Sequence, residues 1–446
     1  MLITEVSTMQ KETNTLHSRD LYLNRLIAFQ DTEPVKIITG IRRCGKSSLL
    51  KLMSRHLRQT GVTDEQIIEM NFESMDFRQL SAEELYRYVK ERLPKGKRVY
   101  LFFDELQRID HWQDAVNSFR VDFDCDIYVT GSNAYLLSSE YATYLAGRSV
   151  EIKMLPLSFH EFLDFHGYTV QERKSPVGGL RKKIIDADGE SYEPQELLEA
   201  YLRFGGMPGI ADVGLNTDKA LTLLDGIYST VVVRDILERN RRRGQRQITD
   251  PNLLRKIIMF LADNIGNSTS ITSISNTLVN ENLLEENRKG NPSVHTIQAY
   301  VGALLESYVF YEIKRFDIKG KEYLRTLGKY YIVDIGLRNY LLGFRDIDTG
   351  HAIENIVYFE LLRRGYDVAI GKVGDKEIDF IATNAEVKKY IQVTESMNEP
   401  ITRERELASL RMIRDNYEKV VIAGSCDNPI TQDGIKIEKL TDFLLA

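Results

Sequence analysis

Residues 40–47 read Gly40-Ile41-Arg42-Arg43-Cys44-Gly45-Lys46-Ser47 and match the pattern G-x-x-x-x-G-K-[ST] at every fixed position. The apolar, β-branched run Val35–Thr39 precedes this stretch, and the helix-forming residues Ser48-Leu49-Leu50 follow it. A strand that turns through glycines into a helix is the setting in which this motif holds phosphate groups. We therefore expect a nucleoside triphosphate to bind at Gly40, Arg42, Arg43, Cys44, Gly45, Lys46, Ser47 and Ser48.

Each part of this loop has a defined chemical task. Backbone N–H groups of the loop point inward, and the N-terminus of the following helix adds the positive end of its dipole. The ammonium of Lys46 would reach the β- and γ-phosphates, and the hydroxyl of Ser47 would complete the coordination of Mg²⁺. The alternative is a chance glycine-rich turn, which would need neither the strand before it nor the helix after it.

The composition is that of an ordinary globular chain. With 446 residues, 43% of them hydrophobic and 28% charged, the chain is long enough for about two to four domains. Its net charge of −6 argues against a surface that coats nucleic acid, although a local basic site stays compatible with it. Cys44, Cys125 and Cys426 lie far apart and predict neither a zinc site nor a disulfide framework.

The sequence also predicts where the protein works. No apolar stretch approaches the ~20 residues of a membrane-spanning helix. The polar N-terminus lacks the apolar core of a signal peptide. We therefore expect a cytoplasmic protein that makes no membrane contact.

Apolar runs alternate with helix-length segments from residue 35 to residue 154. This alternation predicts an α/β fold, in which helices cover both faces of a parallel sheet. The glycine-rich loop follows the first strand, where such sheets bind ligands. The expected strands are Val35–Thr39, Gln66–Phe72, Val99–Asp104, Ile127–Thr130 and Val150–Met154.

A fully apolar run, Val99–Phe103, ends in the two carboxylates Asp104 and Glu105. Buried carboxylates without partners are costly, so a metal or a bound water is the expected partner of this pair. Asp104 would hold Mg²⁺ through water. Glu105 would be the general base that polarises the attacking water. The alternative for Glu105 is a surface acid at the end of a strand.

Two further polar positions accompany the next strands. The strand ending in Tyr128–Gly131 leads to Asn133, which could bond to the γ-phosphate or the attacking water, although T-G-S-N also caps ordinary helices. Arg148 precedes the strand Ser149–Met154 and could stabilise charge on a phosphoryl group, in its own chain or in a neighbouring subunit. A surface arginine or a local ion pair is the alternative for Arg148.

Together these motifs resemble a prokaryotic group of AAA+-like P-loop ATPases. The resemblance covers nearly the whole chain and rests on G-I-R-R-C-G-K-S-S, Y-L-F-F-D-E-L-Q, T-G-S-N, L-A-G-R-S-V-E-I and L-S-F-H-E-F. It implies ATP as the nucleotide, Asn133 as the sensor asparagine and Arg148 as the arginine finger. It also implies a C-terminal part that is related to restriction endonucleases.

Four segments are expected along the chain. They are a P-loop AAA+-like ATPase domain (1–166), an insertion and helical lid (167–246), a winged-helix domain (247–345) and a degenerate restriction-endonuclease-like domain (346–446). The polar residues 170–193 predict an irregular insertion, followed by a helix over Gln195–Phe204 and a bend at Gly205–Gly209. A phosphate-binding cluster or a solvated linker would explain the arginines at 239, 241, 242, 243 and 246.

Three helix candidates precede two β-rich runs between Arg315 and Val333. This order outlines a winged helix, a variant of the helix-turn-helix. Such a domain binds DNA or protein, and its exposed face here is not strongly basic. His295, Gln298 and Lys314 are the polar candidates for a DNA contact. The helix candidates are Leu253–Asp263, Ile271–Val279 and Val294–Phe310.

The last hundred residues follow the order of a restriction-endonuclease-like fold, with a helix over Glu354–Leu362 and strand candidates after Gly365. Glu354 and Asp379 match the first two acidic positions of active members. Where those members carry E-x-K, this chain has Gln392-Val393-Thr394, which removes one carboxylate and one ammonium. We therefore expect a structural or binding domain without nuclease chemistry.

Three functions are compatible with these patterns. The leading hypothesis is an Mg²⁺-dependent ATPase that couples its nucleotide state to a rearrangement of domains or of subunits in a homo-oligomer. The second is a DNA-binding regulator that nucleotide switches. The third is an ATP-gated nuclease. Gln392 and Thr394 argue against it, because they replace the acid and the lysine of the E-x-K motif.

Overall fold

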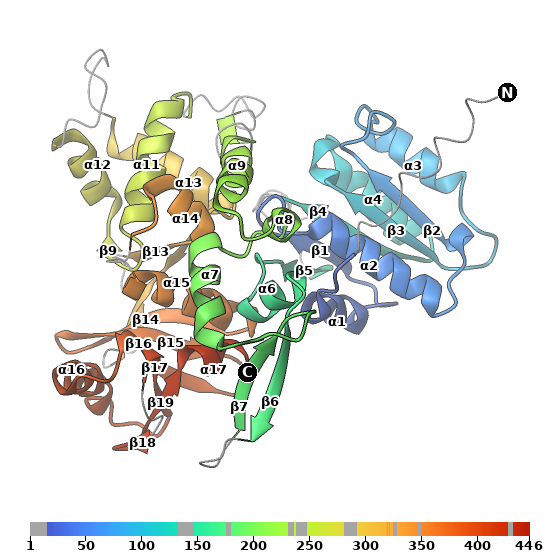
Figure 1. Ribbon diagram of the computed structural model, residues 1–446. Helices are drawn as coiled ribbons and strands as arrows, with labels where there is room; N and C mark the ends of the chain where they lie inside the picture. The colour runs from blue at the N-terminus through green and yellow to red at the C-terminus, as the bar shows by residue number, and fades with distance from the viewer. Residues whose placement is uncertain are drawn as a thin grey trace. The chain divides into compact units, whose positions relative to one another are not determined.

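The computed structural model divides the described part of the chain into two compact units (Figure 1). The first unit holds the described residues up to Met154, except Gly40–Cys44 and Ser132, and the second unit holds these exceptions and everything described from Leu155 onward. The division of the chain into the four predicted segments stays a prediction. The described residues are 16–132, 147–174, 180–230, 236–237, 248–280, 292–318, 320, 322–323, 328–345, 349–426 and 431–446.

The first unit contains a five-stranded sheet, counted over its described residues. Its strands are β1 Val35–Thr39, β2 Ile67–Asn71, β3 Val99–Asp104, β4 Cys125–Gly131 and β5 Ser149–Lys153. Their order is β2-β3-β4-β1-β5, and every pairing is parallel. All five predicted strands are therefore confirmed, and so is the α/β fold with a parallel sheet.

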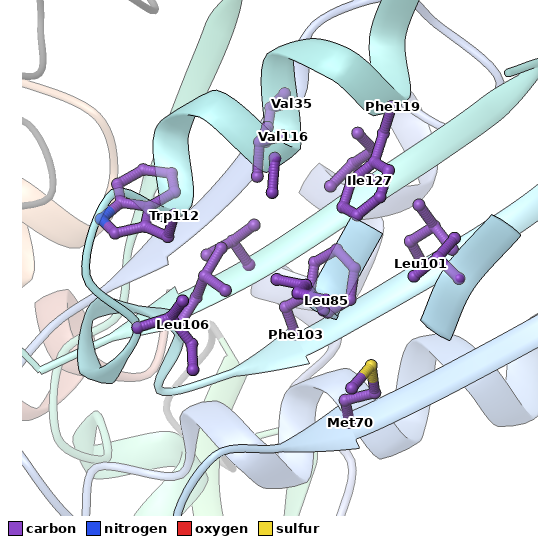
Figure 2. Packing of buried hydrophobic residues seen from close by; sticks show 14 of the residues in the cluster. Val35, Met70, Leu85, Leu101, Phe103, Leu106, Trp112, Val116, Phe119 and Ile127 are labelled. Atoms are coloured by element: carbon purple, nitrogen blue, oxygen red, sulfur yellow. The ribbon is translucent and has the colours of Figure 1, made fainter. Parts of the chain in front are cut away.

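Helices cover both faces of this sheet, and its strands β1, β3 and β4 are buried along nearly their whole length. They are α1 Asp20–Ala28, α2 Lys46–Gln59, α3 Ala82–Lys90 and α4 Trp112–Asp122. Figure 2 shows the face on which α3 and α4 pack, where the rings of Phe103 and Phe119 lie 5.7 Å apart within one buried cluster. The helices α1 and α2 pack together, and α2 contacts β3 and β4.

The second unit begins with a helix and a small antiparallel sheet. Its first elements are α6 Phe159–Phe165, β6 Thr169–Lys174, β7 Leu180–Ile185, β8 Ser191–Tyr192, α7 Pro194–Phe204, α8 Gly209–Val213 and α9 Thr217–Ile227. The prediction of an irregular insertion over residues 170–193 is wrong, because β6, β7 and β8 pair in this segment. The register places Glu172 opposite Lys182 and Val170 opposite Ile184, and cross-strand pairs of both kinds stabilise a sheet.

Three helices and a second antiparallel sheet follow. They are α11 Pro251–Asp263, β9 Ser268–Thr269, α12 Ile271–Asn280, α13 Val294–Glu306, β10 Phe310–Ile313 and β13 Gly328–Ile332. In this sheet β13 lies between β10 and β9. The helix predicted over Val294–Phe310 is too long: Tyr308 has a φ of 57°, outside the helical region, and β10 starts at Phe310.

A larger mixed sheet of eight described strands completes the second unit, in the order β12-β11-β14-β15-β16-β17-β19-β18. Its elements, with their helices, are β11 Arg315–Asp317, β12 Glu322–Tyr323, α14 Ile335–Leu342, α15 Thr349–Arg363, β14 Asp367–Val373, β15 Lys376–Thr383, β16 Lys388–Ser396, α16 Pro400–Arg411, β17 Glu418–Ser425, β18 Thr431–Gln432, β19 Ile435–Lys439 and α17 Leu440–Leu444. The chain between β10 and β13 supplies β11 and β12. β11 pairs in parallel with β14, with Phe316 opposite Gly371.

Candidate functional site

The glycine-rich loop joins the end of β1 to the start of α2. Its backbone has positive φ angles at Gly40 (142°), Arg43 (66°) and Gly45 (104°). A Cβ atom at Gly45 would lie 3.3 Å from the terminal methyl of Met154, in a backbone conformation that L side chains rarely adopt. The pattern's second glycine is therefore required by local conformation as well as by the motif.

The N-terminus of α2 follows this loop directly and has no side-chain cap. Gly45 is its N-cap residue and has no side chain that could bond to the first N–H groups of the helix. The first helical bond runs from Leu49 N to Gly45 O at 2.9 Å. Lys46 is 4% exposed, and Ser47 is exposed. An anion is the natural partner of such a helix end.

Three neighbouring strands end in polar side chains at the same edge of the sheet. Asp104, at the end of β3, is 7% exposed. Its Oδ1 accepts a hydrogen bond from the Thr130 hydroxyl on β4 at 2.5 Å, and its Oδ2 accepts one from Nδ2 of Asn71 on β2 at 3.0 Å. The structure thus brings Asp104 to the edge that leads into the loop, since Thr39 lies opposite Gly131 in the same sheet.

Glu105 has an unusual backbone conformation. Its φ of 57° and ψ of 41° lie in the left-handed region, which few residues other than glycine adopt. Its backbone N–H donates to the Thr130 hydroxyl at 2.9 Å, and its Oε2 accepts from Nε2 of Gln107 at 2.5 Å. Strained residues of this kind gather at functional sites.

Sequence reasoning missed Asn71, Thr130 and Gln107 as neighbours of the two acids. Asn71 is the last residue of β2 and Thr130 the penultimate residue of β4, which marks both as polar residues near a strand end, but their contact with Asp104 depends on the order of the strands. Gln107 lies two residues after Glu105 in the motif that had been quoted, but its contact depends on the local turn. Asn133 lies outside the described residues.

Arg148 does not join this group. It is exposed and immediately precedes β5, and its carbonyl oxygen accepts the N–H of Val35, the first residue of β1, at 2.9 Å. Since β1 and β5 are parallel, Arg148 lies at the N-terminal edge of the sheet. Four residue steps of a strand, about 13 Å, separate that edge from the edge of the loop.

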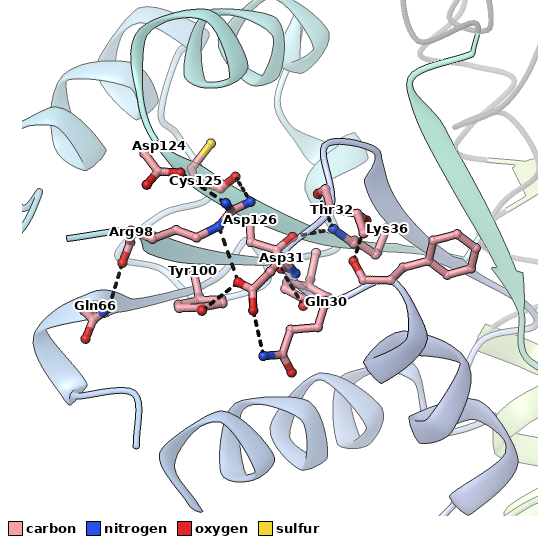
Figure 3. A network of polar contacts seen from close by, with 12 residues as sticks. Gln30, Asp31, Thr32, Lys36, Gln66, Arg98, Tyr100, Asp124, Cys125 and Asp126 are labelled. Atoms are coloured by element: carbon pink, nitrogen blue, oxygen red, sulfur yellow. Dashed lines mark hydrogen bonds and ion pairs between the residues drawn. The ribbon is translucent and has the colours of Figure 1, made fainter. Parts of the chain in front are cut away.

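A second polar network occupies the N-terminal edge (Figure 3). Lys36 and Asp126 form an ion pair with side chains that are 0% exposed, and Lys36 also donates to the Thr32 carbonyl at 2.8 Å. Asp126 accepts further bonds from the Tyr128 hydroxyl and from Asp31 N. Burial lowers the pKa of Lys36, although Asp126 opposes this effect. These groups bond to one another, so the network fits a structural role.

The C-terminal acids Glu354 and Asp379 also lie in one cluster. Oε1 of Glu354 accepts from the ammonium of Lys329 on β13 at 2.9 Å and from the Tyr331 hydroxyl at 2.5 Å. The same ammonium lies 2.9 Å from Oε1 of Glu377. Burial and the charge of Glu354 raise the pKa of Asp379 well above its ordinary value, against the effect of Lys329. Sequence reasoning missed Lys329, which belongs to another sheet.

Neither a cluster of metal ligands nor a helix that could span a membrane occurs among the described residues. Over the described ranges, no group of three or more His, Cys, Asp or Glu side chains could hold a metal ion. A magnesium ion bound by phosphates and one or two protein oxygens does not need such a group. No helix among the residues described has the length and apolarity to cross a membrane.

Comparisons with known families match two parts of the chain. Residues 32–163 match the family described as an AAA domain, and residues 195–348 match a domain of unknown function, DUF8612. A solved structure, the Walker-type ATPase of Pyrococcus abyssi, aligns with a TM-score of 0.45 at 16% identity, covering 73% of this chain and 95% of that chain.

Two relatives extend over almost the entire sequence. An uncharacterized protein of Haemophilus influenzae is 39% identical over 432 residues, which are 96% of this chain and 98% of that protein. An uncharacterized protein of Methanocaldococcus jannaschii is 31% identical over 419 residues, 91% of this chain and 84% of that protein. The chain therefore belongs to the family of these two relatives, and its residues 32–163 match an AAA domain.

Proposed function

We propose that this protein binds ATP with Mg²⁺ at the loop of residues 40–47, hydrolyses it, and couples the nucleotide state to a rearrangement of domains or subunits. The observation that carries the proposal is the common edge of the parallel sheet. The glycine-rich loop, the buried Asp104 and the strained Glu105 all follow strands that end there.

The donor set at this edge fits a magnesium nucleotide. Lys46 would neutralise the β- and γ-phosphates, and the exposed Ser47 hydroxyl and the Asp104 carboxylate would hold the ion, the latter through water. Bound magnesium would draw charge from the phosphate oxygens. Hard oxygen donors and a single carboxylate are what Mg²⁺ prefers. Loop N–H groups from Gly40 to Ser48, including those of Arg42, Arg43 and Cys44, would bind the remaining phosphate oxygens.

Glu105 would act as the general base. It polarises the attacking water, whose proton it accepts, and positioned bases of this kind contribute about 10²–10⁴-fold to rate. Asn133 is proposed to orient the same water or the γ-phosphate; it lies outside the described residues.

Arg148 is proposed to act on a neighbouring chain. An arginine side chain reaches about half of the ~13 Å that separates the two edges of this sheet. The loop of its own chain is therefore out of range, whereas the loop of a second copy is not. The active site would then be complete only in a homo-oligomer.

The second unit is proposed to contain a helical lid within residues 167–246, a winged helix over 247–345 and a degenerate restriction-endonuclease-like domain over 346–446. The helices α11, α12 and α13 with the sheet β10-β13-β9 support the winged helix. The order α15-β14-β15-β16-α16-β17 supports the endonuclease-like domain. Glu354 is already bound to Lys329 there, which argues against nuclease chemistry together with Gln392 and Thr394.

DNA binding through the winged helix stays the alternative function. One observation counts against this alternative. The chain between β10 and β13, where a winged helix has its wing, supplies β11 and β12 to the C-terminal sheet. The arginine-rich segment 239–246 lies outside the described residues. A duplex-binding assay at low salt, with a steep loss of binding as salt rises, would favour it.

The deciding experiment measures ATP turnover per chain over a wide range of protein concentration. We expect the rate to rise with concentration, and to fall by about 10³-fold in Arg148→Ala. Lys46→Ala should lose tight ATP binding. Arg92→Ala, which removes an arginine stacked on Tyr88, is the control and should keep the wild-type rate.

A mixture of the two inactive variants separates action within a chain from action between chains. Lys46→Ala chains would supply Arg148 to the intact loops of Arg148→Ala chains, so part of the turnover should return. No recovery, together with a rate that does not depend on concentration, would remove Arg148 from the proposal. Absence of ATP binding in the wild type would overturn the proposed function itself.

A further inference from the structure

Thr130 contacts both acids of the proposed reaction through one hydroxyl. The residue is 0% exposed near the end of β4. Its hydroxyl donates to Oδ1 of Asp104 at 2.5 Å and accepts from the backbone N–H of Glu105 at 2.9 Å. The direction of each bond is settled by chemistry, because an ionised carboxylate only accepts and an amide N–H only donates.

The carboxylate of Asp104 is held from two sides. Thr130 bonds to Oδ1, and Asn71 bonds to Oδ2 from the opposite neighbouring strand at 3.0 Å. Asn71 is anchored in turn, because its Oδ1 accepts the N–H of Glu73 at 2.8 Å. Rotation of the carboxylate would break both bonds, so its remaining lone pairs keep a fixed direction.

The same hydroxyl supports the strained backbone of Glu105. A left-handed conformation is unfavourable for a residue with a side chain. The bond to Thr130 satisfies the Glu105 N–H in this conformation, while Gln107 holds the carboxylate. The direction in which the Glu105 side chain leaves the backbone therefore depends on Thr130.

We propose that Thr130 is a positioning residue for ATP hydrolysis, which sets the direction of Asp104 toward a metal-bound water and the backbone conformation of Glu105. The inference rests on the proposed function. It predicts that loss of the hydroxyl changes the magnesium requirement and the turnover rate, while ATP itself still binds through the loop and Lys46.

The test compares Thr130→Val with Thr130→Ser. Valine replaces the hydroxyl by a methyl group, and serine keeps the hydroxyl. Tyr128→Phe is the matched control, since it removes one buried hydroxyl from the same strand, but at the N-terminal edge, where it bonds to Asp126. For each variant we would measure kcat, KM for ATP, the Mg²⁺ concentration at half-maximal rate, and unfolding in urea.

We expect Thr130→Val to lower kcat at least tenfold and to raise the half-maximal Mg²⁺ concentration several-fold, with little change in KM. Thr130→Ser should stay within about threefold of the wild type, and Tyr128→Phe should change stability alone. A wild-type kcat and Mg²⁺ requirement in a folded Thr130→Val would overturn the inference.

Two further measurements keep the inference testable under other outcomes. If Thr130→Val does not fold, Asn71→Leu should still raise the Mg²⁺ requirement, because it frees the other oxygen of Asp104; an unchanged requirement would count against the inference. If the wild type binds ATP without hydrolysing it, the Mg²⁺ dependence of ATP binding replaces turnover. That result would sink the proposed hydrolysis, and an unshifted Mg²⁺ dependence in Thr130→Val would separately sink the role of Thr130.

Discussion

Two acidic clusters in this molecule have similar sequence signals and opposite surroundings. Asp104 accepts hydrogen bonds from two neutral side chains, those of Asn71 and Thr130. Glu354 is bonded to a buried ammonium, that of Lys329, and to the Tyr331 hydroxyl. A carboxylate with neutral donors keeps its charge for a cation, whereas one beside a buried lysine already has its counter-ion. The partner, more than the acid, distinguishes the proposed metal-binding carboxylate from the structural one.

The largest expected effect lies in the first cluster. Glu105→Gln keeps the shape of the side chain but removes the base, so turnover should fall about 10³-fold while ATP stays bound. Turnover and nucleotide binding measured on the same sample would check this. Undiminished hydrolysis would show that Glu105 is no base, and the contrast between the clusters would lose its chemical meaning.

Lys329→Met should have the next largest effect, and it should act on stability. The substitution leaves Glu354 buried without its cation, which typically costs about 3–5 kcal/mol. Urea unfolding measures this loss. Adding Glu354→Gln to Lys329→Met should restore part of the stability, because the uncompensated charge is then gone. A loss below about 1 kcal/mol in the single variant would contradict the counter-ion role.

The pH dependence of stability should differ between wild type and Asp379→Asn. The pKa of Asp379 is raised in the folded protein. The protonated carboxyl therefore contributes fully to the free energy of unfolding below its ordinary pKa of about 3.9, and this contribution is lost as pH rises through the folded pKa. Glu354 and Glu406 raise this pKa, while Lys329 and the Val393 N–H lower it.

Asparagine does not titrate, so Asp379→Asn should gain stability relative to wild type as pH rises above about 4. The gain should stay smaller than the loss in Lys329→Met. Unfolding free energies of both proteins at a series of pH values would check it. A difference that does not vary with pH would mean that Asp379 is ionised throughout.

Glu377→Gln should have the smallest effect. Its carboxylate also contacts Lys329, but its side chain is 33% exposed, so water takes over much of the lost interaction. We expect a change below about 1 kcal/mol in urea unfolding. A loss comparable to that of Lys329→Met would show that Glu377, and not Glu354, is the main partner of the lysine.

Apolar runs in the sequence predicted the strands that such runs form. The strands Val35–Thr39 and Val99–Asp104 agree residue for residue with their predictions, because each is an apolar run bounded by polar or glycine residues. The polar strands β6 and β7 were missed, because cross-strand pairs rather than apolar alternation stabilise them.

The sequence predicted the acidic residues of the candidate sites. It did not predict the side chains that bond to them. Asp104 and Glu105 stand out at the end of an apolar strand. Asn71 and Thr130 reach Asp104 only because β2 and β4 flank β3, and no local pattern contains that order. Lys329 meets Glu354 for a similar reason, since it comes from a strand of another sheet. Contacts of this kind follow from topology.

Because β11 and β12 join the C-terminal sheet, the last hundred residues do not contain the whole of that sheet. The strands β11 and β12 precede the last hundred residues in sequence, yet they lie at one edge of the C-terminal sheet, where β11 pairs with β14. A fragment that starts at residue 346 would leave the backbone of β14 unpaired, and an open edge of this kind invites pairing with other chains. Such a fragment should aggregate unless residues 315–323 are supplied with it. A fragment or a gene fusion that carries this sheet therefore needs residues 315–323 as well as the chain from residue 346 onward.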